Sequence, residues 1–219
     1  MQRTPEPELM DHPDQVRAYA EADFAEGNTM FVDRLLERLD PERKSGRLVD
    51  LGCGPGDILY RLAARLPGWT LFGVDAGRNM LTEAERRRPT GIGRESVEFV
   101  HARLPDTAGI DGPFDAVVSN SVLHHLPDPS VLWNTVARLS GDATTVQVMD
   151  LERPESEARA RQLVDEYAAG EPRVLREDFY NSLRAAWTLD EIREQIASAG
   201  LALSAERVSD RHWMVHGAT

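Results

Sequence analysis

The sequence predicts an α/β fold in which helices flank one mostly parallel sheet. Short apolar stretches alternate with amphipathic helical stretches from residue 46 to residue 150, the pattern expected where a crossover helix follows each strand. The first apolar stretch runs directly into a glycine-rich turn, and the chain ends in two short strand-like stretches separated by a turn, which indicates a hairpin. Because such crossovers are right-handed, a ligand cleft is expected at the carboxyl ends of the strands.

The glycine-rich turn is central to this prediction. Residues 48–51 read as a buried strand and residues 58–66 as the helix that follows. Three alternating glycines lie between them: Gly52, Gly54 and Gly56. Glycine reaches backbone angles that are closed to other residues, and it lets a ligand lie almost against the main chain. A ligand in this turn would face the amides at the start of the helix.

A second acid follows at the distance expected of a nucleotide site. Residues 71–75 read as the next strand, which ends in Asp75. A carboxylate in this place can accept two hydrogen bonds from a ribose diol, and Asp50 can accept hydrogen bonds from an ammonium group or from loop amides. We therefore expect a nucleoside-containing ligand. The alternative, an ordinary strand-turn-helix corner, leaves the glycines and both acids unexplained.

The remaining core elements keep the alternation. We expect helix 79–88, strand 97–101, strand 114–119, helix 130–139 and strand 144–149. Pro89-Thr90-Gly91 closes the first of these helices, and Gly141 stops the second. The strand at 114–119 leads to the adjacent pair His124-His125, and the last strand ends at Asp150.

Both ends of the chain depart from this alternation. Apolar residues at helical spacing predict two helices within residues 14–39, broken at Gly27-Asn28, and residues 1–13 are expected to be loose or only locally ordered. After the core we expect helices over 155–169 and 173–186, a third helix capped by Thr188, and strands over 203–208 and 212–216.

Three stretches resemble motifs of one known family. DLGCGPGD resembles the first motif of class I S-adenosylmethionine-dependent methyltransferases, GVDAGRNML resembles the second, and FDAVVSNSVLHHLPDP resembles the fourth-strand motif of small-molecule members. The glycine spacing is GxGxG, whereas nicotinamide dinucleotide sites carry GxGxxG. The resemblance implies a Rossmann-like seven-stranded sheet with a C-terminal antiparallel hairpin, S-adenosylmethionine as cofactor, and O-, N- or C-methylation of a small molecule.

The family's architecture also implies a division of the chain. We expect a single domain over 1–219, made of N-terminal cover helices (1–45), a cofactor-binding core (46–154), a helical lid insertion (155–187), and a last helix and hairpin (188–219).

The resemblance implies a set of cofactor contacts at the strand ends. They are Asp50, Gly52, Cys53, Gly54, Gly56, Asp75, Ala76, Met80, Ala102, Arg103, Leu104 and Asn120. In the family a Gly-Asp pair precedes a Leu-Pro beside the adenine, but this chain has Ala102-Arg103 there. A backbone carbonyl or Asp106 would therefore have to accept the adenine amino hydrogen.

Methyl transfer from a sulfonium is an in-line displacement, so the site must chiefly align its reactants and exclude water. A base is needed only for a protonated nucleophile. His124 and His125 are the candidate bases, because imidazole titrates near neutral pH, and Asp150 could orient one of them. Some sugar O-methyltransferases of this class carry a comparable pair. The alternative is that one histidine caps or packs under the following helix.

Substrate contacts are expected from the N-terminal cover and the lid. The candidates are Tyr19, Arg153, Tyr180 and Arg184. An arginine could bind a carboxylate through two hydrogen bonds. Each of these residues could equally be a packing or surface residue.

The composition narrows the possible partners. A formal charge of −12 disfavours a broad nucleic-acid surface and favours a small or cationic substrate. Cys53 is the single cysteine, which fits a reducing compartment, and the histidines are too scattered to predict a metal site. Neither a signal-length apolar run nor an apolar stretch of roughly 20 residues is present. We therefore expect a cytoplasmic protein without membrane or nucleic-acid partners, and a possible homodimer.

Three alternative functions stay open. The same sulfonium could serve transfer of a different group or a cyclisation. A non-catalytic cofactor-binding regulatory protein would keep the same glycines, and a dinucleotide oxidoreductase would keep a similar turn.

Overall fold

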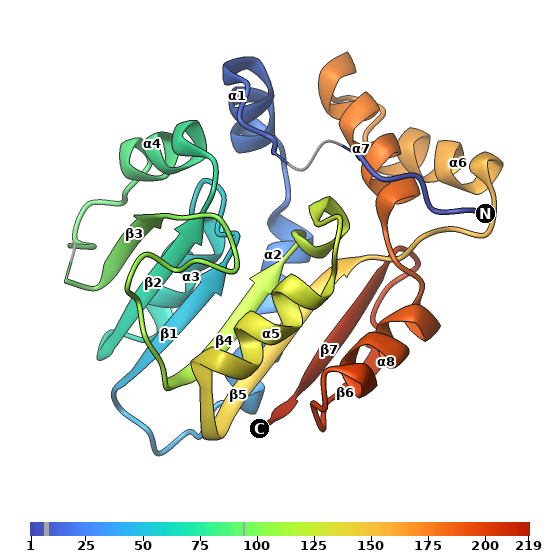
Figure 1. Cartoon of the computed structure of the whole chain (residues 1–219). Coiled ribbons are helices and arrows are strands. Elements are labelled where there is room, and N and C mark those ends of the chain that lie inside the picture. Colours follow the sequence, from blue (N-terminus) through green and yellow to red (C-terminus); the bar gives the residue numbers. More distant parts are fainter. Residues whose placement is uncertain (7–8, 94) are drawn as a thin grey trace.

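The computed structural model describes residues 1–6, 9–93 and 95–219. Its strands form one sheet in the order β3-β2-β1-β4-β5-β7-β6, in which β7 is antiparallel to both neighbours and the other pairs are parallel (Figure 1). The strands are β1 (Gly46–Leu51), β2 (Trp69–Asp75), β3 (Val97–His101), β4 (Phe114–Asn120), β5 (Ser140–Leu151), β6 (Ser204–Arg207) and β7 (His212–Ala218). The predicted mostly parallel seven-stranded sheet with a C-terminal antiparallel hairpin is confirmed.

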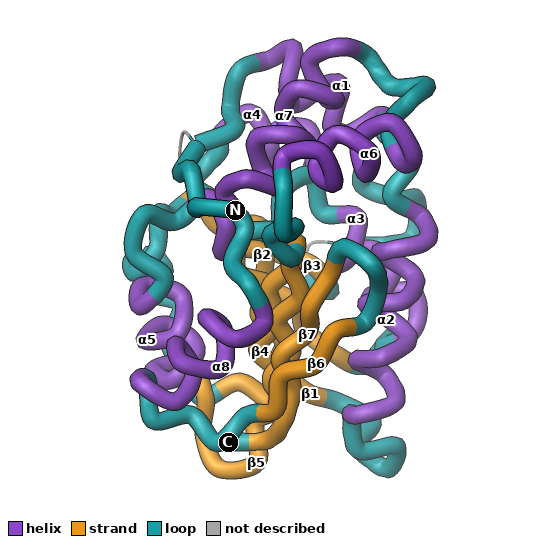
Figure 2. The backbone as a smooth tube through the Cα atoms, turned by 90° about the vertical axis from the view of Figure 1, so that its right-hand side faces the viewer, coloured by secondary structure: helices purple, strands orange, loops and turns teal. Residues whose placement is uncertain are grey.

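Helices cover both faces of the sheet and its carboxyl edge. They are α1 (Pro13–Glu21), α2 (Ala25–Arg38), α3 (Asp57–Arg65), α4 (Arg78–Arg86), the short 3-10 helix η1 (Leu123–His125), α5 (Ser130–Leu139), α6 (Glu157–Tyr167), α7 (Arg173–Ala185) and α8 (Leu189–Ser198). The edge view shows α2 and α3 on one face and α5 and α8 on the other (Figure 2). Helices α1, α6 and α7 lie beyond the carboxyl ends of the strands (Figure 1).

The central strands are buried on both faces, which explains their nearly continuous apolar sequences. Leu48 in β1 joins the cluster that contains Leu35 of α2 and Leu59 of α3. The next residue, Val49, points the other way into the cluster that contains Leu132 of α5. Each such fully buried side chain contributes about 1.5–3 kcal/mol relative to an exposed one.

Two predictions about the N-terminal region are wrong. The helix break lies at residues 22–24, not at Gly27-Asn28. Phe24 is the N-cap of α2, and the Asp23 side chain stabilises the turn before the helix by accepting a hydrogen bond from the amide of Ala25 (3.0 Å). Residues 1–6 are also ordered against other elements: the amide of Thr4 donates to the carbonyl of Arg184 (2.9 Å). Residues 7 and 8 of the same segment lie outside the described residues.

Helices α6 and α7 share a small core of their own. Leu163 and Val164 of α6 pack with Leu183 of α7, and Leu151 at the end of β5 joins them. Helix α8 begins as predicted, because Thr188 and Glu191 form a reciprocal capping box.

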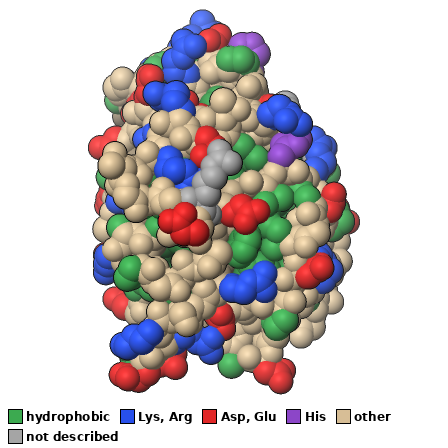
Figure 3. Space-filling model, turned by 90° about the vertical axis from the view of Figure 1, so that its left-hand side faces the viewer, with side chains coloured by type: hydrophobic (Ala, Val, Ile, Leu, Met, Phe, Trp, Pro, Cys, Tyr) green, Lys and Arg blue, Asp and Glu red, His purple; other side chains and the backbone are tan. Residues whose placement is uncertain are grey.

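The surface carries charges of both signs. On the face at the β3 edge of the sheet, basic and acidic side chains are interspersed (Figure 3). Within the described part of the chain, no helix is both long and apolar enough to cross a membrane.

Candidate active site

A pocket of about 280 Å³ lies at the carboxyl ends of the central strands. It is bounded by the glycine-rich turn, the ends of β2 and β4, the region of α1 and the start of α2, and η1. Most of the predicted site residues line it: Tyr19, Asp50, Gly52, Cys53, Gly54, Asp75, Ala76, Met80, Ala102, Arg103, Leu104, Asn120 and His125. The fold therefore brings these residues together at one pocket, although they are spread over more than 100 positions of the sequence.

The three positions of the turn are occupied by glycine for different physical reasons. Gly52 has a φ of +79°, and a Cβ there would overlap the side chain of Val122. Gly54 also has a positive φ, +52°, but a Cβ would meet nothing within 4 Å, so this position faces open space in the pocket. Gly56 precedes α3 with a φ of +81° and packs on Phe99, and it does not line the pocket. Of the three glycines, Gly54 is the one at which an added side chain would project into the pocket without meeting protein atoms.

Asp75 holds the turn in shape. Its Oδ2 accepts a hydrogen bond from the amide of Gly54 (2.8 Å), and its Oδ1 accepts one from the amide of Gly77 (2.7 Å). Burial raises the pKa of Asp75 although both amides favour the carboxylate. Each carboxylate oxygen keeps a further lone pair, so the group can still accept hydrogen bonds from a ligand.

Asp50 is a buried carboxyl group with one unsatisfied oxygen. The residue is 1% exposed, and its Oδ1 has no hydrogen-bond partner among the described residues. Burial, followed by repulsion from Asp75, raises the pKa of Asp50 to about 8. Asn120, at the end of β4, also has a buried side-chain oxygen without such a partner. A cation with hydrogen-bond donors would satisfy these oxygens, which is what the ammonium group of an amino-acid-bearing cofactor presents.

His124 and Asp150 form a buried pair behind the pocket. His124 Nδ1 lies 2.6 Å from Asp150 Oδ1, and the amide of His124 donates to Asp150 Oδ2 (3.1 Å). Burial alone would lower the pKa of His124, but the charge and hydrogen bond of Asp150 raise it above its ordinary value. Burial would conversely raise the pKa of Asp150, and His124 holds it below its ordinary value. Their side chains are 4% and 1% exposed, so neither borders the pocket.

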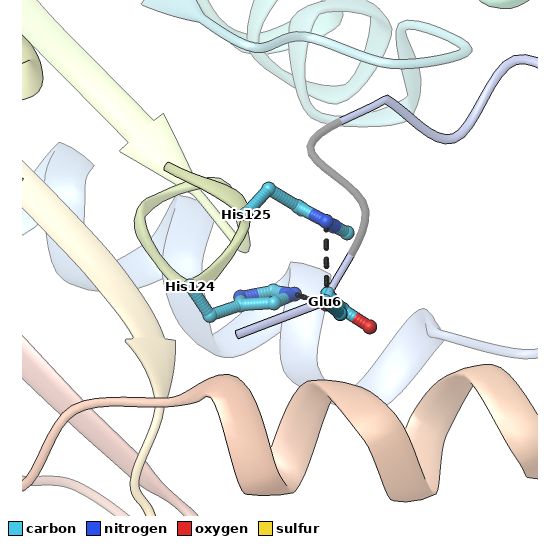
Figure 4. Close-up of side chains that lie close together, drawn as sticks. All are labelled: Glu6, His124 and His125. Atoms are coloured by element: carbon cyan, nitrogen blue, oxygen red, sulfur yellow. Dashed lines mark ion pairs between the residues drawn. The ribbon is translucent and has the colours of Figure 1, made fainter. Parts of the chain in front are cut away.

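Glu6 joins the two histidines from the N-terminal segment. Its Oε1 lies 3.2 Å from His125 Nδ1 and 3.5 Å from His124 Nε2, and all three side chains point toward one another (Figure 4). Their ligand atoms lie within 4.8 Å of one another, close enough to hold a metal ion. The prediction that there is no metal site rested only on the spacing of the histidines. Glu6 lies 118 residues from His124 in the sequence, so that spacing could not reveal it.

The remaining substrate candidates, apart from Tyr19, lie outside the pocket. Arg153 donates to the carbonyls of Met1 (3.1 Å) and Ala186 (3.0 Å) and to Glu191 Oε1 (2.7 Å). The guanidinium of Arg184 lies 5.5 Å from the ring centre of Tyr180, which borders a separate hollow between α6 and α7. Arg153 thus connects the N-terminus to α8, and none of these three residues lines the pocket at the strand ends.

Sequence reasoning missed several residues at the pocket. Leu9, Met10, Asp57, Arg61 and Arg87 line it. Asp57 is the first residue of α3, and its carboxylate accepts hydrogen bonds from Asn28 Nδ2 (2.6 Å) and Arg61 Nε (2.7 Å). Its position directly after the last glycine was an available signal.

Comparison with known proteins agrees with this architecture. Residues 49–143 match the model of a methyltransferase domain. A trans-aconitate 2-methyltransferase of Methylobacterium nodulans is 35% identical over 152 residues, which cover 68% of this chain and 54% of that protein. The chain therefore spans about half the length of this curated relative.

Solved structures share the fold at low identity. A methyltransferase from Aquifex aeolicus, described as dependent on S-adenosylmethionine, has a TM-score of 0.68 at 14% identity, covering 95% of this chain and 99% of its own. The plantazolicin methyltransferase BpumL, solved with S-adenosylhomocysteine, has a TM-score of 0.69 at 13% identity, covering 93% of this chain and 90% of its own.

The sheet order, the glycine turn and the pocket at the carboxyl edge define a Rossmann-like protein of the methyltransferase type. Over residues 49–143 this chain carries a methyltransferase domain, and its fold is that of the S-adenosylmethionine-dependent methyltransferases it is similar to.

Proposed function

We propose that this chain transfers a methyl group from S-adenosylmethionine to a small-molecule nucleophile. The observation that carries the proposal is the buried Asp50 carboxylate, whose Oδ1 has no hydrogen-bond partner among the described residues and which lines the pocket beside the open face of Gly54. A buried acid without a partner is costly unless a ligand supplies one. An amino-acid-bearing sulfonium cofactor supplies a cation at that point.

The residues present fit such a cofactor. Asp50 would accept hydrogen bonds from its ammonium group, and Asp75 would accept them from the ribose hydroxyls. Ala102, Arg103 and Leu104 line the same pocket and would border the adenine. The main chain of the glycine turn would border the cofactor closely, since a Cβ at Gly54 would meet nothing within 4 Å.

The cofactor, when bound, supplies an electrophilic methyl group on a positively charged sulfur. His125 is the imidazole that borders the pocket, so we propose it, ahead of the buried His124, as the base for a protonated acceptor. The His124–Asp150 pair would position the η1 segment that carries His125. A deprotonated acceptor such as a carboxylate needs no base.

Tyr19 is proposed to border the acceptor. It lines the pocket, and its ring lies 4.7 Å from that of Phe24. Burial raises the pKa of Tyr19 to about 12, so its hydroxyl stays protonated and can donate a hydrogen bond. The relative named for trans-aconitate supports a small acceptor.

Product analysis with methyl-labelled cofactor tests the proposal. The label should move to the acceptor with equal formation of S-adenosylhomocysteine, across a panel of hydroxyl, amine and carboxylate compounds. Unlabelled product would indicate other sulfonium chemistry. Cofactor binding without turnover would indicate a regulatory protein, and tighter binding of nicotinamide dinucleotides in calorimetry would contradict the cofactor assignment.

Three broader expectations are also proposals. They are a cytoplasmic location, which rests on the single cysteine, a homodimer, which sedimentation would test, and the division of the chain into cover, core, lid and hairpin segments. The separate small core of α6 and α7 supports the lid segment.

A further inference from the structure

The carboxylate of Glu6 occupies a site that other elements build around it. Ser182 of α7 donates a hydrogen bond from its Oγ to Glu6 Oε1 (3.0 Å). His125 Nδ1 and His124 Nε2 of η1 approach the same oxygen to 3.2 and 3.5 Å (Figure 4). Three groups able to donate therefore converge on one carboxylate oxygen, although Glu6 is the only one of the four residues in the N-terminal segment. We call His124, His125 and Ser182 the carboxylate site.

The carboxylate site is preorganised for a negative charge. Asp150 accepts from His124 Nδ1, which fixes the ring so that Nε2 faces Glu6. The carboxylate of Asp150 also raises the pKa of His124, which favours the charged form of the ring that faces Glu6. Removal of Glu6 without replacement would leave this charge and the Ser182 hydroxyl facing an empty space, which is unfavourable. The groups that converge on Glu6 Oε1 can therefore serve another carboxylate in its place.

Glu6 itself is not held unusually tightly. Burial raises the pKa of Glu6 despite the opposing effects of His124 and Ser182, so its carboxylate is less well stabilised here than in water. Its side chain is 8% exposed. The rest of its segment is held at Met1, Arg3 and Thr4. Arg3 donates to the carbonyls of Ala185 (2.6 Å) and His124 (3.1 Å), and the amide of Thr4 donates to the carbonyl of Arg184 (2.9 Å). Glu6 can thus leave the site without loss of the Arg3 contacts.

The carboxylate site adjoins the main pocket. His125 and Leu126 line that pocket, and so do Leu9 and Met10, which follow Glu6 in the chain after two residues outside the described part. An acceptor in the pocket would meet His125 first and Glu6 directly behind it.

We propose that His124, His125 and Ser182 bind a carboxylate group of the methyl acceptor, and that Glu6 occupies their site until the acceptor displaces it. This inference rests on the proposed function and narrows its substrate class to carboxylic acids. Exchange of one carboxylate for another conserves the charge and the hydrogen bonds of the site. A neutral or cationic acceptor would conserve neither, so the site selects acids.

A bound metal is the other use of these side chains. Glu6, His124 and His125 have the right atoms within 4.8 Å, but Glu6 Oε1 already accepts from Ser182, and His124 Nδ1 is engaged by Asp150. The geometry is explained by hydrogen bonds alone. The two possibilities predict opposite effects of removing Glu6.

Glutarate, which carries a carboxylate on a chain like that of glutamate, is the probe, measured by calorimetry against wild type, Glu6→Ala and Asp14→Ala. If Glu6 fills the site at least nine-tenths of the time, its removal tightens glutarate binding about tenfold or more. Asp14→Ala removes an exposed acid from α1 and should bind as wild type does. Adding Ser182→Ala to Glu6→Ala should reverse most of the gain, and the neutral diamide of glutarate should not bind any variant.

The outcomes separate the possibilities. Equal glutarate affinity in wild type and Glu6→Ala, or no effect of Ser182→Ala, overturns the inference. Stoichiometric Zn²⁺ binding by wild type that Glu6→Ala abolishes assigns the cluster to a metal and also overturns it. Binding of S-adenosylhomocysteine by the same samples shows whether the cofactor site is intact, so this inference can fail while the proposed function stands. If Glu6→Ala does not fold, Glu6→Gln keeps the volume and should still strengthen glutarate binding.

Discussion

The protonation of Asp50 provides the sharpest test of the cofactor site. A pKa of about 8 means that roughly nine-tenths of the Asp50 carboxyl groups are protonated at pH 7 in the unliganded protein. A cofactor ammonium beside Asp50 would favour the carboxylate. Binding of S-adenosylmethionine at pH 7 should therefore release up to about 0.9 proton, and at pH 9 almost none.

Calorimetry in buffers of different ionisation enthalpy measures this release. The apparent binding enthalpy should depend on the buffer at pH 7 in wild type, and this dependence should vanish in Asp50→Asn, together with most of the affinity. Asp142→Asn, an exposed change, should behave as wild type does. Methylthioadenosine, which lacks the amino-acid part, should bind without proton release. Buffer-independent binding of S-adenosylmethionine by wild type at pH 7 would refute the reasoning.

The same carboxyl group should influence stability. Because the folded-state pKa of Asp50 is raised, its contribution is fully present below its ordinary pKa and is lost as the pH rises through about 8. At pH 7 the raised pKa of Asp50 lowers the free energy of unfolding by up to about 4 kcal/mol relative to its value at low pH, where the carboxyl group is protonated in both states. Asp50→Asn should therefore raise the melting temperature of the unliganded protein more at pH 8 than at pH 4.

Three further predictions concern stability. Gly52→Ala combines a left-handed backbone with overlap on Val122, so it should cost more than about 2 kcal/mol in denaturant unfolding and abolish cofactor binding; wild-type behaviour would contradict the geometry. Asp150→Asn should cost about 3–5 kcal/mol by breaking the buried pair with His124. This loss should be largest between about pH 4 and pH 6.5, shrinking at lower pH as Asp150 is protonated in the wild type and at higher pH as His124 loses its proton; a pH-independent loss would exclude the ion pair. Thr188→Ala should remove the helix cap and lower the melting temperature by about 2–4 °C, and an unchanged value would show that the cap contributes nothing.

The core of the fold was predictable because its signals are local. Apolar alternation places the central strands within two residues of their observed ends, and Thr188 marks a helix start through its own side chain. Strand β5 is longer than the expected 144–149, since residues 145–151 pair with β7 from the far end of the chain. The break before α2 was misplaced because the glycine signal at residue 27 outweighed Asp23, whose carboxylate stabilises the turn before the helix.

The residues of the candidate site were likewise predictable only where the signal is local in the sequence. Residues that hold the pocket through strand ends, such as Asp50 and Asp75, follow from position in the chain. Glu6 could not be predicted, because only the folded path of the N-terminal segment brings it to His125. The contacts of Arg153 likewise depend on carbonyl groups whose positions the sequence does not encode locally.

Cys53 gives the protein a built-in reporter of the glycine turn. Burial raises the pKa of its thiol well above the ordinary value, and the side chain is 8% exposed. Alkylating reagents attack the thiolate, so the folded turn should protect this residue. The rate of its modification therefore follows transient opening of the turn, and a bound ligand that holds the turn closed should slow that reaction in proportion to its occupancy.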